Sequence, residues 1–215
     1  LCLRAYVLFA RVLFLDELPE FKRSVLEVMR QPLEDRNICI SRATHTVEYP
    51  ASFMLVASMN PCPCGYYNHP EKECVCPPGA VKKYLNKISG PLLDRIDIHM
   101  EIVPVPFEDL SNKPLGESSE VIRNRVIKAR KIQEERFKSE TSIYCNAQMT
   151  SKQLRKYAKL NDQCKVLIEN AMRRLNLSAR AYKRILKVAR TIADLDSSEN
   201  IKKAHVKDGV AYTKF

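Results

Sequence analysis

The sequence predicts an α/β region with a parallel sheet, followed by an all-α region. Two unbroken apolar runs of strand length, residues 12–15 and 53–58, suit strands that are buried on both faces. Beyond residue 119 the apolar residues recur at helical spacing only. The charge also divides: residues 1–110 hold 12 Lys and Arg against 14 Asp and Glu, whereas residues 111–215 hold 24 against 11. We therefore expect two domains, residues 1–110 and 111–215.

Composition narrows the class of protein. The chain is 45% hydrophobic and 28% charged, as in globular proteins, and no stretch approaches the roughly 18 uninterrupted apolar residues of a membrane span. Arg4 and Arg11 interrupt the apolar start, and no cleavage site follows it, so we expect a cytoplasmic protein without a membrane partner. The strongly basic second half suits contact with a polyanion such as nucleotide phosphate or nucleic acid. It also suits a merely solvated helical surface.

Polar residues follow each apolar run where the strand should end. Asp16 and Glu17 follow the first run, and Asn60 follows the second. The carboxyl ends of neighbouring parallel strands meet at one sheet edge, so Asn60 should emerge beside the two carboxylates. Such groups suit a ligand site, although each is also an ordinary loop residue.

The segment between the two runs predicts a helix and a hairpin. Pro19 suits the first turn of a short amphipathic helix that Pro32 ends. Residues 37–41 and 46–49 alternate as hairpin strands around a polar, partly basic tip at residues 42–45. The tip is either a partner contact or a solvated turn.

Four of the eight cysteines fall within fifteen positions: Cys62, Cys64, Cys74 and Cys76. Four thiolates that meet tetrahedrally bind zinc, and a cytosolic setting favours metal over disulfides. His69 is an alternative to one thiolate. Free or redox-active thiols are the other interpretation.

After the cysteines, residues 81–89 predict a helix that Gly90 and Pro91 stop, and residues 98–103 an alternating strand. Arg95 lies between Asp94 and Asp97, and by itself this arrangement reads as a local ion pair. The polar stretch at residues 111–119 is the expected domain boundary.

The second region predicts helices. Ser119 can cap the first, with apolar residues 121, 122, 126, 129 and 132 facing inward; a second begins near residue 150 or 151, and a third covers residues 162–175. Ser178 caps a further helix, on which Arg180, Arg184 and Lys187 share a basic face, and residues 201–212 form the last.

Together these segments resemble one family. VLFLDE resembles a Walker B motif, SMN a sensor-1 strand end, and GPLLDRID the arginine-finger segment of magnesium-chelatase-type AAA+ ATPases. LDELPEF, MNPCPCG and SGPLLDRID resemble the ComM (YifB) group in particular, and the resemblance runs from about Val12 to the chain's end. It implies a partial AAA+ core with a β-hairpin insertion, followed by a helical lid domain that carries sensor 2.

The resemblance also implies roles for individual residues. Asp16 would hold Mg²⁺ at the phosphates of ATP, Glu17 would polarise the attacking water, and Asn60 would position it. Arg95 would reach the nucleotide of a neighbouring subunit, which implies a ring such as a hexamer. LSARAYKRILKVARTIADL resembles the sensor-2 helix, so Arg180, or in its place Arg184, would contact the phosphates. The hairpin would point into the ring's pore, where the candidate DNA contacts are Arg42, Thr44 and His45.

One family feature is missing from this sequence. No glycine precedes Gly65, so these residues contain no GxxxxGK[ST] phosphate loop, and residues 1–11 do not match what precedes Walker B in the family. We expect the 215 residues alone to hydrolyse ATP poorly or not at all. Three functions are open: a motor on DNA in transformation or recombination, a motor subunit of a metal chelatase, and a nonenzymatic module that binds zinc and nucleic acid.

Overall fold

The computed structural model describes residues 11–42, 45–102, 105, 116–141 and 143–213, with only the backbone at residues 11 and 42. The chain forms two compact units that divide between Ile96 and Asp97. The boundary expected near residue 110 lies outside the described residues. No helix in the described part of the chain is long and apolar enough to cross a membrane.

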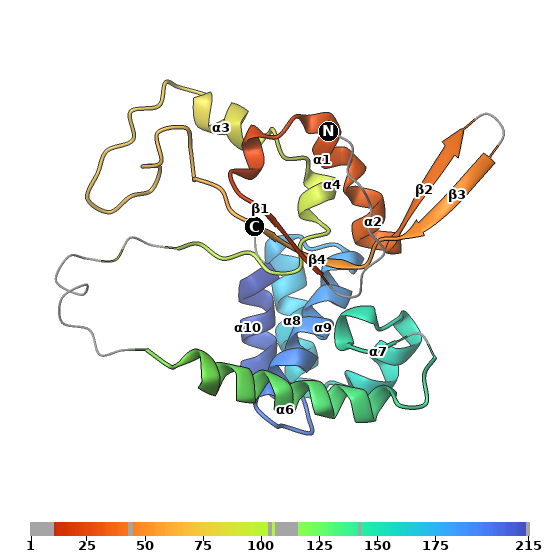
Figure 1. Ribbon diagram of the computed structural model, residues 1–215. Coiled ribbons are helices and arrows are strands. Elements are labelled where there is room, and N and C mark those ends of the chain that lie inside the picture. The colour runs from red at the N-terminus through yellow and green to blue at the C-terminus, as the bar shows by residue number, and fades with distance from the viewer. Residues whose placement is uncertain (1–10, 43–44, 103–104, 106–115, 142, 214–215) are drawn as a thin grey trace. The chain divides into compact units, whose positions relative to one another are not determined.

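The first unit contains the parallel strand pair that the two apolar runs predict. β1 (Arg11–Leu15) pairs with β4 (Phe53–Ala57) (Figure 1). The register ends with Leu15 opposite Ala57. The expectation of burial on both faces is wrong, because Val12 and Phe14 are 57% and 60% exposed. In the described residues this sheet has only two strands, and Leu15 packs on the buried side chains Leu18, Leu26, Ile88 and Leu92.

The predicted hairpin is confirmed. β2 (Asn37–Arg42) and β3 (His45–Pro50) pair antiparallel, with Arg42 opposite His45. Residues 43–44 of the tip lie outside the described residues. The hairpin forms a separate two-stranded sheet, and its strands are largely solvent-exposed.

The helices of the first unit are shorter than the patterns predict. They are η1 (Leu18–Glu20), α1 (Arg23–Val28), α2 (Arg30–Asp35), α3 (Ala80–Leu85) and α4 (Gly90–Leu93). Pro32 does not end a helix, because it lies in the first turn of α2, where its missing N–H costs nothing. Likewise Gly90 and Pro91 begin α4, and the Ser89 hydroxyl caps it by accepting a bond from the Leu92 amide at 3.3 Å.

The second unit is helical, as predicted. It comprises α6 (Ser119–Phe137), η2 (Asn146–Gln148), α7 (Ser151–Tyr157), α8 (Asp162–Leu175), α9 (Ala179–Leu195) and α10 (Lys203–Thr213). Two expectations are wrong. Residues 98–102 form no strand, and instead the His99 amide donates to the Tyr212 carbonyl at 2.9 Å. On α6 the side chains of Val121, Ile122 and Val126 are exposed, and the buried face begins only at Ala129.

The core of this unit lies along α9. Ile185, Ala189 and Ala193 are fully buried there with Val206 of α10 and Cys164 of α8. α10 approaches α9 closely, since a Cβ at Gly209 would lie 3.2 Å from the Ile185 carbonyl oxygen. The second unit therefore has a hydrophobic core of its own.

Candidate functional site

The two strands bring Asp16 and Ser58 together at the carboxyl edge of the sheet. Hydrogen bonding continues past the strands: the Ser58 amide donates to the Leu15 carbonyl at 3.0 Å, and the Leu18 amide to the Ser58 carbonyl at 2.9 Å. Asp16 Oδ1 accepts bonds from the Ser58 hydroxyl and, at 3.0 Å, from the Glu17 amide. Both bonds that Asp16 accepts from described residues fall on Oδ1, which leaves Oδ2 available to a cation or to water bound by one.

Glu17 adopts a strained backbone conformation at this edge. Its φ of 50° and ψ of 52° are left-handed, a conformation that costs a residue with a side chain about 1–3 kcal/mol when the surrounding structure imposes it. The surrounding bonds of Asp16 and Leu18 to Ser58 fix the chain on either side of Glu17. The turn places the exposed carboxylate of Glu17 directly beyond β1.

Asn60 follows Ser58 by two residues and lies near the phenol of Tyr84 on α3. Burial raises the pKa of Tyr84, and the carboxylates of Glu20 and Glu17 and the Cys62 thiol raise it further, while the Asn60 backbone amide opposes them. Tyr84 is only 7% exposed. Both the Glu17 carboxylate and the Asn60 backbone are close enough to the Tyr84 phenol to change its pKa. The segments that carry these two residues therefore lie near each other at the carboxyl edge of the sheet.

Arg95 is held within its own unit by Glu34 and by the Pro91 carbonyl. Its Nη2 pairs with the Glu34 carboxylate on α2, and its Nη1 donates to the Pro91 carbonyl at 2.6 Å. The side chain is 13% exposed. The structure shows no contact between Arg95 and Asp16, Glu17 or Asn60 within the described residues.

The two candidate sensor-2 arginines have different surroundings. Arg180 is exposed in the first turn of α9, whereas Arg184, one turn later, is buried and its Nε lies 3.5 Å from Asp97 Oδ1. Lys187 donates to the Ala147 carbonyl at 2.8 Å. The three basic residues of the expected face therefore differ in burial and in their contacts.

The hairpin residues are only partly described. His45 is exposed at the start of β3, and the Arg42 backbone pairs with it. Thr44 lies outside the described residues.

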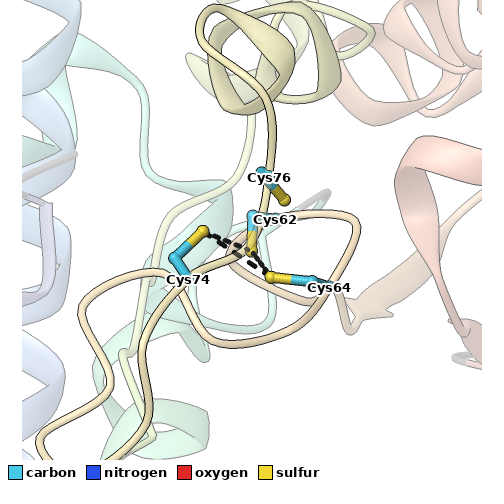
Figure 2. Close-up of side chains that lie close together, drawn as sticks. All are labelled: Cys62, Cys64, Cys74 and Cys76. Atoms are coloured by element: carbon cyan, nitrogen blue, oxygen red, sulfur yellow. Dashed lines mark hydrogen bonds between the residues drawn. The ribbon is translucent and has the colours of Figure 1, made fainter.

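The four cysteines form one cluster (Figure 2). The Cys62 sulfur lies 3.3 Å from that of Cys64 and 3.8 Å from that of Cys74, and 3.6 Å separates Cys64 from Cys74. The Cys76 sulfur completes the set, because all four lie within 4.8 Å of one another. His69 is not a member: its Nδ1 accepts bonds from the amides of Glu71 and Lys72, each at 3.1 Å.

The local sequence explains this cluster. A turn closes between the Cys62 carbonyl and the Gly65 amide at 3.0 Å, and Gly65 has the positive φ of 82° that glycine adopts without strain. The turn directs the Tyr66 amide at the Cys64 sulfur, and this bond lowers the pKa of Cys64 to about 6. A bond from the Cys64 amide lowers the pKa of Cys76, but burial and the other three thiols outweigh it and raise that pKa to about 12. Without a cation, the lowered pKa lets the Cys64 thiol ionise easily, whereas the raised pKa values of Cys74 and Cys76 oppose ionisation of those thiols.

These distances fit a tetrahedral metal centre. With Zn–S bonds of about 2.3 Å, tetrahedral geometry places sulfurs about 3.8 Å apart. The three measured separations of 3.3, 3.6 and 3.8 Å are close to that value. The residues present therefore suit zinc in number, element and spacing.

Sequence reasoning missed several partners in these sites. Ser58, Tyr84, Glu34 and Asp97 contact or approach candidate residues, although the sequence assigned none of them a role. Ser58 is the last residue of the second apolar run and Asp97 is the last residue of GPLLDRID, whereas no pattern marks Tyr84 or Glu34.

Comparison with known proteins identifies the family. Residues 9–110 match the family described as magnesium chelatase, subunit ChlI, and residues 116–213 match its C-terminal part. The chain is 45% identical over 202 residues to the competence protein ComM of Haemophilus influenzae and 43% identical over 203 residues to the uncharacterized protein YifB of Escherichia coli K12. It is 40% identical over 202 residues to YifB of Salmonella typhimurium. Each alignment covers 94% of this chain and 38% of the relative, so the chain spans well under half of these proteins. Matches to both parts of one family, in order and across nearly all residues, show that the chain belongs to the magnesium chelatase subunit ChlI family and is similar to its ComM and YifB members.

Proposed function

We propose that the chain is the Walker B, sensor and lid portion of an ATP-hydrolysing AAA+ motor that assembles as a ring, such as a hexamer. The parallel pairing of β1 with β4 supports this proposal most strongly. It brings Asp16 and Glu17 to the sheet edge where the segment carrying Asn60 begins. Family membership supports a motor of this general type.

The residues at this edge divide the work of hydrolysis. Mg²⁺, when bound, neutralises charge on the phosphates, and the Asp16 carboxylate, whose Oδ2 is open, would hold it through its water shell. Glu17 orients and polarises the attacking water, and the Asn60 amide positions that water or the terminal phosphate. The bond from Ser58 fixes Asp16, so the Ser58 hydroxyl is a positioning group.

Two arginines, Arg95 and Arg180, complete the proposed site. Arg95 acts in trans on the nucleotide of the neighbouring subunit, which requires its pair with Glu34 to be exchanged for contact with phosphate. Arg180 contacts phosphate in cis, as the exposed member of the α9 pair. The burial of Arg184 and its pair with Asp97 favour a structural role for Arg184.

The substitution Glu17→Gln tests the enzyme class. In the full-length gene product it keeps the side chain's size but removes the charge that polarises water, so we expect kcat for ATP hydrolysis to fall at least about 100-fold while nucleotide binding persists. Steady-state ATPase assays and nucleotide titration measure the two effects. Glu71→Gln, an exposed carboxylate in the cysteine loop, is the matched control. Unchanged turnover in Glu17→Gln would contradict the proposed role of Glu17, and no turnover in the wild type would favour the nonenzymatic module. The 215 residues alone should show little turnover, because they contain no phosphate loop.

The motor's substrate has two candidates. The net charge of residues 111–215 and the polar hairpin tip favour DNA, as the ComM resemblance implies for branch migration in transformation or recombination. The description of the matched family favours a chelatase motor instead. DNA affinity that falls steeply with salt, together with ATPase stimulation by branched DNA, supports the first candidate. Absence of both supports the second.

We also propose that the four-cysteine cluster binds structural zinc. Cys62→Ser or Cys74→Ser should abolish stoichiometric zinc, since three thiolates and a poorer fourth ligand bind it more weakly. Metal analysis of the purified full-length gene product measures this effect. Cys39→Ser, on the exposed hairpin, is the matched control and should retain the metal. Zinc content unchanged by both cluster substitutions would exclude the site.

A further inference from the structure

The cysteine cluster lies between two elements of the proposed nucleotide edge. Cys62 is the second residue after Asn60, at the exit of β4, and Cys76 precedes the start of α3 by four residues. Residues 61–79, all of them described, contain no helix or strand. A metal held by Cys62 and Cys76 would therefore be the main cross-link between the end of β4 and the beginning of α3.

α3 in turn packs against the segment that follows Glu17. Lys87 Nζ, just beyond α3, lies 3.2 Å from Glu20 Oε1 and 5.5 Å from the centre of the Tyr84 ring. Ile88 is buried in the same cluster as Leu18. Tyr84, which is buried on the same helix, is close enough to the carboxylates of Glu17 and Glu20 and to the backbone of Asn60 for all three to influence its phenol.

Cys62, Tyr84 and Asn60 differ in how deeply they are buried. Cys62 is fully buried and Tyr84 nearly so, whereas Asn60 itself is exposed. An exposed residue on a chain without regular structure keeps a defined position only if its neighbours are anchored. The anchors present here are Cys62 on its C-terminal side and the Tyr84 phenol beside its backbone.

We propose that metal binding by the four cysteines fixes Asn60 at the nucleotide edge, with Tyr84 as the positioning residue that relays the constraint. The proposal rests on the proposed function, because it concerns the proposed role of Asn60 in hydrolysis. In this proposal the cysteine cluster is a structural part of the nucleotide edge. The alternative is an independent module that happens to follow the edge in sequence.

The first test removes the metal. Cys74→Ser is chosen because Cys74 is half-buried, so that substitution disturbs the fold less than one at Cys62. In the full-length gene product, purified with zinc, we expect loss of zinc, faster hydrogen exchange at residues 58–60 and in α3, and a fall in kcat between about 10- and 100-fold. KM for ATP should change much less, since the phosphate contacts of other residues remain.

The second test removes the relay but keeps the metal. Tyr84→Phe deletes the hydroxyl and retains the ring. We expect full zinc content, faster exchange at residues 58–60, unchanged exchange in the cysteine loop, and reduced kcat with nearly constant KM. Tyr67→Phe, an exposed tyrosine within the same loop, is the matched control and should behave as the wild type.

Two results would overturn the inference. One is zinc loss in Cys74→Ser with wild-type exchange at residues 58–60, and the other is a Tyr84→Phe variant indistinguishable from Tyr67→Phe. Failure of the proposed function is a separate outcome: the wild type would not hydrolyse ATP, or Glu17→Gln would hydrolyse it normally. The exchange measurements would still decide whether the metal and Tyr84 order Asn60.

Discussion

Asp194 shows how a single carboxylate organises buried charge in the helical unit. Its oxygens accept bonds from Arg136 Nη1 at 2.6 Å, from Asn146 Nδ2 at 2.7 Å and from Arg190 Nε at 3.1 Å. The Asp194 side chain is fully buried, and that of Arg190 is 4% exposed. Burial lowers the pKa of Arg190 and Asp194 opposes that effect, so the carboxylate offsets part of the cost of burying the guanidinium.

We expect Asp194→Asn to destabilise the helical unit by about 3–5 kcal/mol, because it leaves two arginines without their common counter-charge. Hydrogen exchange of the α9 amides in the full-length gene product measures the free energy of local opening. Asp208→Asn, exposed on α10, is the matched control and should change that free energy by less than about 0.5 kcal/mol. Equal exchange rates in the two variants would show that Asp194 is not a structural centre.

The hairpin β2–β3 is an element whose proposed use depends on its tip. Loss of one phosphate contact weakens DNA binding about equally for all sequences and lowers the salt slope by about one. We expect Arg42→Ala to have this effect on the full-length gene product, measured by fluorescence anisotropy at several salt concentrations. Lys152→Ala, an exposed lysine on α7, should leave the slope unchanged. A wild-type slope in Arg42→Ala would remove the hairpin from the DNA contact.

Elements were predictable where local chemistry alone decides them. Ser178 caps α9 by accepting from the Ala181 amide at 3.2 Å, and Thr150 with Gln153 forms a capping box on α7, so both helices begin where the sequence indicates. The parallel strand pair and the spacing of the cysteines were equally local signals.

Other elements depend on what the chain packs against. Residues 98–102 alternate like a strand, but they bond to the end of α10 through His99 instead of to a neighbouring strand. Pro32 was expected to end a helix but lies in the first turn of α2. A proline at the end of one helix and a proline in the first turn of the following helix give the same sequence pattern. Arg95 pairs with Glu34 and Arg184 with Asp97, and both pairings are set by tertiary approach, which no sequence pattern indicates.

At the scale of the whole molecule, the charge separates along the chain. Residues 1–110 are nearly neutral, whereas residues 111–215 carry a surplus of 13 positive charges, from 24 Lys and Arg against 11 Asp and Glu. A motor that acts on nucleic acid needs attraction for that polyanion and a separate site for nucleotide. If the affinity for nucleic acid falls strongly with salt while ATP turnover changes little, the two functions are separate in this way.

The proposed ring has a further consequence, because an arginine finger in trans makes each active site a property of two subunits. Arg95→Ala and Glu17→Gln proteins should each be nearly inactive alone, since a finger contributes about 10³- to 10⁵-fold to turnover. In rings mixed at equal ratio, an intact Glu17 from one variant meets an intact Arg95 from the other at about one interface in four, so ATPase should recover toward a quarter of wild type. Steady-state assays of the mixture measure this recovery.

The matched control replaces the Arg95→Ala protein with one that carries both substitutions. No interface in that mixture combines an intact Glu17 with an intact Arg95, so we expect no recovery. If the first mixture also stays inactive although the two variants assemble together, Arg95 acts within its own subunit. Its pair with Glu34 would then be a structural contact, as the arrangement within the first unit already permits.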